Sequence, residues 1–280
     1  MAFEPLFAIH SAAVARSFAG MPEILETFSE LGGHAEWAPN EKVALEVALG
    51  VAYGVMWLLL AGRAAGAGAQ LSAMFYGLTS AAVVFPLVVE ATTTLGFLAP
   101  AASAAVLLGT AAIGLDVARR RDLKDLAWVI TAGAALTAVI LAVATREMVL
   151  FASLLQVLAV VAFVAGARRG WRAAGWFAIL LLDALLVVMI SVAVVASPDR
   201  FAPLFRPASL VALLLAAVVI SFGEIVARTR RVGEELRWSE IVQGTLAGVI
   251  GAGGSFGVTY RTGALGAEAG VAVLAFAAAA

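Results

Sequence analysis

The sequence predicts an all-α protein, a polytopic integral membrane helical bundle of about eight transmembrane helices plus a truncated ninth. Hydrophobic residues make up 63% of the 280 residues and charged residues only 13%, whereas soluble domains are about one quarter charged. Residues 173–196 contain a single charged residue, Asp183. At 1.5 Å of rise per residue these residues form a helix of roughly 36 Å, which is long enough to cross a hydrocarbon core of about 30 Å.

Similar apolar runs recur along the chain, and each predicts one spanning helix. Residues 70–117 are too long for one span, so we divide them near Glu90 and Thr92–Thr94. The eighth run is rich in glycine, which weakens helix propensity but lets helices approach closely. The predicted runs are 43–62, 70–89, 95–117, 126–145, 148–166, 173–196, 207–227, 241–260 and 264–280.

The two ends of the chain differ from this pattern. Residues 1–42 are the longest polar segment, and we expect them to be an extracytoplasmic tail. Within it, apolar residues from Met21 to Leu31 recur at helical spacing and predict a short amphipathic helix. This helix would pack on the bundle or the membrane interface, or alternatively bind a partner. The last run reaches Ala280 with no polar flank, so we expect the transmembrane domain 43–280 to be incomplete at its C-terminus.

The composition excludes several kinds of chemistry. The chain has no cysteine, which rules out disulfides and thiolate metal sites, and its net charge of −1 argues against a nucleic-acid partner. Both histidines, His10 and His34, precede the first span. Residues 253–257 match the G-x-S-x-G pattern of hydrolases, but they lie in a glycine-rich span with no histidine after them. We therefore expect no catalytic, cofactor-binding or metal-ligating residues, and no enzyme.

Glycines four residues apart predict close helix packing inside the bundle, with a dimer face as the alternative. These pairs are Gly50 and Gly54, Gly244 and Gly248, and Gly253 and Gly257.

The arginines and lysines predict the orientation in the membrane. Twelve of the 18 fall in the loops that follow the first, third, fifth and seventh spans. Because cytoplasmic loops carry an excess of basic residues, these loops are expected inside and the N-terminus outside. Trp128, Trp171, Trp176 and Trp238 fall near the same boundary, as in an aromatic belt.

Asp183 and Gln156 form the candidate intramembrane polar site. Each lies near the middle of its predicted span, and the two spans are neighbours joined by a short loop. No basic residue lies in a span core to pair with Asp183, so the uncharged carboxyl is favoured and could exchange hydrogen bonds with the amide. One interpretation is structural attachment between helices. The other is a proton-coupled or substrate-contacting carboxyl group. Glu46, Glu90 and Glu224 lie nearer to span ends and are weaker candidates.

The chain is marked by short hydrophobic hairpins, high alanine and leucine content, and inner loops with arginine and tryptophan. In these features it resembles the large uncharacterised multi-span proteins of many bacteria. This resemblance implies a location in a bacterial cytoplasmic membrane. The expected function is that of a non-enzymatic membrane module, either a scaffold or a sensor. The alternative is a transporter or lipid-handling protein with a cavity near Asp183. The expected partners are membrane lipid and either a second copy or another membrane protein.

The orientation can be tested with reporter fusions. We expect a periplasm-active reporter to be active when fused at residue 40 and inactive at residue 234, because the arginine-rich loops stay in the cytoplasm. The opposite activities would show that the predicted topology is inverted.

Overall fold

The computed structural model describes residues 39–167, 171, 173–195, 204–232 and 238–262, and within them every regular element is helical. By its contacts the chain divides into two units, Met1–Ala44 and Leu45–Ala280. Of the first unit only residues 39–44 are described, and they belong to the start of helix α2. The predicted amphipathic helix near residues 21–31 and the predicted ninth run lie outside the described residues.

Eight helices in the described part are long and apolar enough to cross a membrane, which confirms the predicted helical membrane bundle. The last of the eight spans combines two α-helices with a π-helical turn, η1, between them. The elements are α2 (Pro39–Gly66), α3 (Gln70–Thr93), α4 (Pro100–Arg121), α5 (Lys124–Thr145), α6 (Met148–Gly166), α7 (Ala173–Val195), α9 (Pro207–Val232), α10 (Trp238–Gly248), η1 (Val249–Gly253) and α11 (Gly254–Thr262).

The division between the second and third spans is confirmed, but the third helix begins later than predicted. Residues 95–99 form a turn rather than the start of a helix. Gly96 has a φ of +60°, which favours glycine, and Pro100 takes the first helical position of α4. The N–H of Leu95 donates to the Glu90 carbonyl at 3.0 Å, so the end of α3 keeps its polar groups satisfied.

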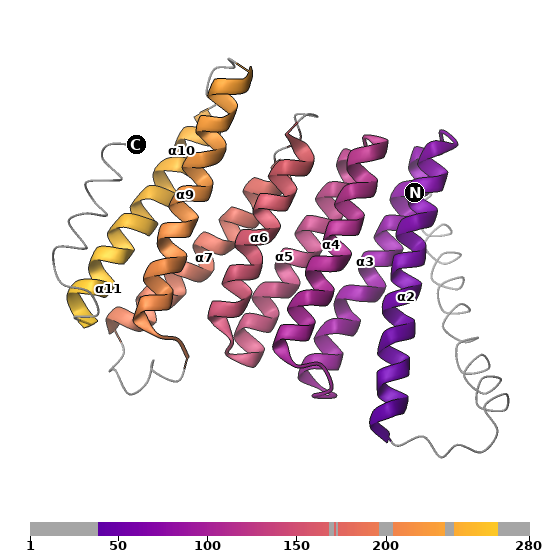
Figure 1. Ribbon diagram of the computed structural model, residues 1–280, viewed down its shortest axis with the longest axis horizontal. Helices are drawn as coiled ribbons and strands as arrows, with labels where there is room; N and C mark the ends of the chain where they lie inside the picture. Colours follow the sequence, from indigo (N-terminus) through magenta and orange to yellow (C-terminus); the bar gives the residue numbers. More distant parts are fainter. Residues whose placement is uncertain (1–38, 168–170, 172, 196–203, 233–237, 263–280) are drawn as a thin grey trace, which may run out of the picture. The chain divides into compact units, whose positions relative to one another are not determined.

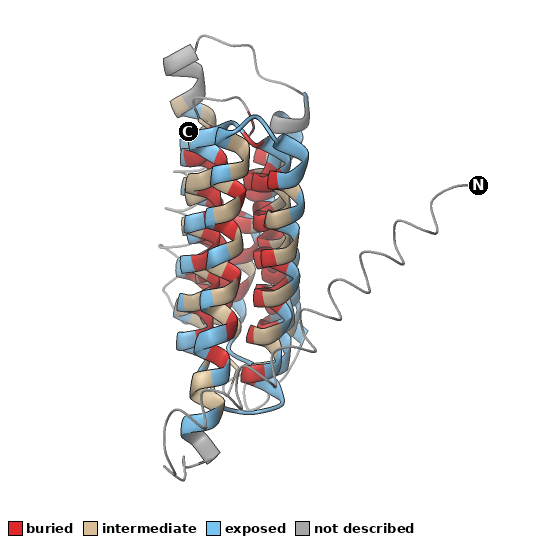
Figure 2. Ribbon diagram, turned by 90° about the vertical axis from the view of Figure 1, so that its right-hand side faces the viewer, coloured by how far each residue is buried: buried red, intermediate tan, exposed pale blue. Residues whose placement is uncertain are grey.

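Within Leu45–Ala280 the helices run up and down in two rows (Figure 1). Helices α3, α5 and α7 contact one another in sequence along one row, and α4, α6 and α9 do so along the other. Viewed along the rows, the buried residues face the space between them (Figure 2). Large side chains such as Leu107, Ile130 and Phe151 are fully buried there.

The up-and-down order places the C-terminal ends of α2, α4, α6 and α9 at one end of the bundle (Figure 1). The sequence concentrates arginine at and after these helix ends. The four tryptophans of the predicted belt are near this end, but they are not alike. Trp238 is 77% exposed, whereas Trp171 is buried and donates through Nε1 to Oδ1 of Asp122 at 3.2 Å. The aromatic-belt interpretation is therefore wrong for Trp171, which joins two connections of the protein instead.

Glycines let large side chains of one helix reach the backbone of the next. Val84 of α3 lies over Gly54 of α2, and Phe85 of α3 lies over Gly133 of α5. Two of the predicted glycine pairs are confirmed as internal contacts, because Gly50 and Gly54 meet α3 while Gly244 and Gly248 meet α9.

The third predicted pair is different. A Cβ atom added at Gly253 or Gly257 would meet no other described residue within 4 Å, so this pair makes no close contact with another described helix. Gly251, in the same span, is closely covered: an added Cβ would overlap Val218 and lie 3.0 Å from the backbone oxygen of Leu214.

These surroundings predict opposite effects of two alanine substitutions in one span. Gly251→Ala should lower the stability of the bundle by about 1–3 kcal/mol, because the backbone of α9 has to move. Gly257→Ala should be neutral or stabilising by up to about 1 kcal/mol, because it gains helix propensity without a clash. Thermal unfolding of the purified variants in detergent measures both effects. Equal losses of stability would contradict the packing of α9 against this span.

Candidate functional site

Asp183 is the most deeply buried acidic residue of the described spans. It lies in the middle of α7 and is 2% exposed. Its Oδ2 atom accepts a hydrogen bond of 3.4 Å from Nε2 of Gln243, and this length is near the upper limit for such a bond. Its Oδ1 atom has no hydrogen-bond partner among the described residues. The carboxyl group is therefore buried and only half satisfied.

Gln156 makes a stronger contact with a different helix. It is 7% exposed in α6, and its Nε2 atom donates to the backbone oxygen of Leu213 in α9 at 2.7 Å. A carbonyl oxygen has two lone pairs, so Leu213 can accept this bond while it remains in the helix. The amide thus ties α6 to α9, which are 57 residues apart at these two positions.

The predicted hydrogen bond between Asp183 and Gln156 is not formed. Both residues are buried as the sequence predicted, and α6 packs on α7, but their described bonds go to Gln243 and Leu213. The prediction used the depth of each residue in the membrane. Helix α6 also contacts α4, α5 and α9, and depth alone does not select one neighbour among these.

Gln243 is not among the site residues predicted from the sequence. This residue lies in α10, only a few positions from the start of the helix, and it is half-buried. A polar residue inside an apolar run was the available signal. What could not be read from the sequence is that α10 packs beside α7, which brings Gln243 to Asp183.

The helix that carries Gln243 changes geometry a few residues later. Residues Val249–Gly253 form a π-helical turn, and α7 contacts this turn as well as α10 and α11. π-Helical turns within α-helices occur often at functional sites. Asp183 therefore faces the least regular span of the described bundle.

Some of the other polar groups join helices or lie near the ends of helices. Thr92 and Ser103 share a buried hydrogen bond of 2.6 Å that joins α3 to α4. Glu46 and Glu90 are exposed, and Glu224 is half-buried in α9. In the described part of the chain, no group of three His, Cys, Asp or Glu residues is arranged to hold a metal ion.

In comparisons with protein-family models, with curated proteins and with solved structures, none matches the chain. Its function therefore has to be inferred from the contacts of its own residues.

The observed partners predict which polar residues are energetically coupled. Gln156→Leu should lower stability by about 1 kcal/mol, the usual size of an intramembrane hydrogen bond. In a double-mutant cycle with Asp183→Leu, the two effects should add within about 0.5 kcal/mol, because the residues do not bond to each other. Thermal unfolding of the two single variants and the double variant gives the coupling energy. A coupling energy above about 1 kcal/mol would instead support the Asp183–Gln156 hydrogen bond predicted from the sequence.

Proposed function

We propose that this chain is a non-enzymatic membrane module, a scaffold or sensor-type transmembrane domain. The observation that carries this proposal is the hydrogen bond from Gln156 to the Leu213 carbonyl. Through this bond a buried amide near the middle of α6 attaches α6 to α9. This bond gives the Gln156 amide a structural role between α6 and α9.

The hydroxyl groups inside the spans support the same proposal. Most bond to a carbonyl one turn earlier in their own helix, as Thr145 does with Leu141 and Ser153 with Val149. Ser255, the serine of the hydrolase-like pattern, is buried within α11 and donates to the Gly251 carbonyl at 2.6 Å. A hydrolase nucleophile needs a sharp strand-to-helix turn and a base within reach. A helical Ser255 bonded to its own backbone fits a structural role.

The proposed location is a bacterial cytoplasmic membrane with the N-terminus outside. Support comes from the up-and-down order of the helices, which gathers the arginine-rich connections at one end. Cytoplasmic ends of membrane proteins carry such an excess of basic residues.

A transporter is the second candidate, and one observation favours it. Asp183 has an unpaired oxygen, and the residue that donates to its other oxygen lies on the span with the π-helical turn. Buried acidic residues in membrane spans often belong to proton relays or substrate pathways. Movement of α10 relative to α7 would break the long bond from Gln243 and expose the carboxyl group.

Substitution of Asp183 separates the two candidates. In a scaffold, Asp183→Asn keeps a polar group at the same depth and should change stability by less than about 0.5 kcal/mol, while Asp183→Leu should cost no more than about 1 kcal/mol. Infrared difference spectra of the purified protein between pH 5 and pH 9 should then show an unchanged carboxyl band.

The transporter candidate predicts a different spectrum. A carboxyl band that disappears between these pH values, and that is missing from Asp183→Asn, would identify a titrating site and overturn the scaffold. Gln156→Leu is the matched control, because it removes a buried polar group of the same bundle without removing a carboxyl group.

A further inference from the structure

A groove between α2 and α4 combines apolar walls with arginines, and neither proposed function uses it. Its volume is about 580 Å³, within the range of roughly 300–1,000 Å³ found for small-molecule sites. All of its lining residues belong to the unit Leu45–Ala280, and they come from the second half of α2 and the second half of α4.

The polarity of the groove changes in the same direction along both helices. On α2, the apolar Leu59 precedes Arg63 by about one turn. On α4, Val117 precedes Arg121 by about one turn and Ile113 precedes it by about two. Arg63 and Arg121 lie in the last turns of their helices, whereas the apolar residues lie deeper in the spans. Leu59 and Ile113 are both exposed. The groove is thus apolar toward the middle of the membrane and basic at its end.

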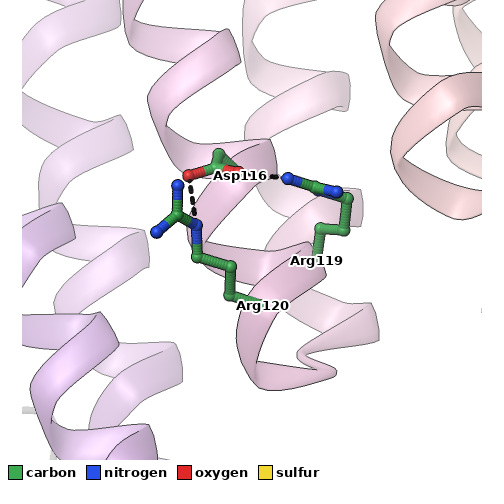
Figure 3. A network of polar contacts seen from close by, with 3 residues as sticks. All are labelled: Asp116, Arg119 and Arg120. Atoms are coloured by element: carbon green, nitrogen blue, oxygen red, sulfur yellow. Dashed lines mark hydrogen bonds and ion pairs between the residues drawn. The ribbon is translucent and has the colours of Figure 1, made fainter.

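Three arginines face this groove and one aspartate partly balances them. Asp116 bonds to Nε of Arg120 at 2.7 Å and to Arg119 at 2.8 Å (Figure 3). The bond from Arg120 uses Nε, so its two terminal nitrogens remain available to another acceptor. The lining residues Arg63, Arg120 and Arg121 with Asp116 carry a net charge of +2.

Arg121 extends across the groove to the opposite helix. Its Nη1 atom lies 3.0 Å from the position that a Cβ atom would take on Gly66 of α2. Neither Arg121 nor Arg63 has an ion-pair partner among the described residues. Two free guanidinium groups therefore lie at the basic end of the groove, one from each helix.

We propose that this groove binds one anionic phospholipid, with its phosphate at Arg63 and Arg121 and an acyl chain along Leu59 and Ile113. Guanidinium groups bond phosphate oxygens in pairs, and basic pockets between transmembrane helices bind anionic headgroups. The order from apolar to basic along both helices matches the order from acyl chain to phosphate in a lipid leaflet. A soluble anion would match only the basic end.

Native mass spectrometry of the purified full chain in detergent can test this, with phosphatidylglycerol and phosphatidylcholine of the same acyl chains as probes. The double variant Arg63→Gln with Arg121→Gln should bind phosphatidylglycerol roughly 30-fold more weakly, which corresponds to about 1 kcal/mol for each arginine. The matched control is Lys124→Gln with Arg228→Gln, which removes two charges outside the groove at the same end of the bundle. It should bind within twofold of the unsubstituted chain.

Asp116→Asn gives a test of opposite sign. It removes the negative charge of the groove and should tighten phosphatidylglycerol binding about fivefold. Equal losses in the two double variants would show general attraction to a basic surface and overturn the site. Equal binding of phosphatidylcholine would overturn it as well, as would full displacement of the lipid by an equal concentration of inorganic phosphate.

Discussion

Lipid tails are as apolar as leucine, so helices in a bilayer gain little from burying apolar side chains against one another and depend on close packing instead. In this bundle, closeness comes from glycines that receive a side chain of the next helix. Gly77 of α3 receives Leu126 of α5, Gly133 of α5 receives Phe85 of α3, and Gly175 of α7 receives Phe163 of α6. The first two contacts join neighbours within one row, and the third joins α7 of that row to α6 of the other.

Several polar groups in the spans form hydrogen bonds that the packing permits. Thr92 reaches Ser103 because α3 and α4 are joined by a short turn, and Gln156 reaches the Leu213 carbonyl because α6 packs against α9. The buried hydroxyls of Ser80, Thr110, Thr131 and Ser221 have no hydrogen-bond partner among the described residues, but Asp183 differs in being a carboxyl group, with a single long bond and one unpaired oxygen. Leaving a buried polar atom unpaired costs free energy, and such costs tend to persist where a group has a function. For this physical reason, substitution of Asp183 distinguishes the scaffold from the transporter.

The two ends of the bundle differ in their charged residues. This difference affects contacts with lipid more than contacts between helices inside the bundle. Arginine side chains gather at the end where α2 and α4 finish, and apolar residues line the groove below them. At the opposite end, the last turn of α3 carries Glu90, Thr92 and Thr93, and neither this turn nor residues 94–99 include a basic residue. An anionic lipid in the groove between α2 and α4 would add contacts between two helices that already meet at Gly62 and Val117. The lipid would then help to hold α2, the least buried of the eight spans, against the bundle.

The sequence by itself determined the eight spans and most of their limits, since span length and apolar composition follow directly from the thickness of the bilayer. It also determined that Asp183 and Gln156 would be buried, because both lie near the centres of apolar runs. Only the tertiary structure decided their partners. A residue in a central helix has neighbours on several sides, and the rotation of each helix about its axis depends on side-chain contacts spread over the whole chain. For the same reason, the groove between α2 and α4 could not be predicted, because it joins residues about 50 positions apart that meet only when the helices pack.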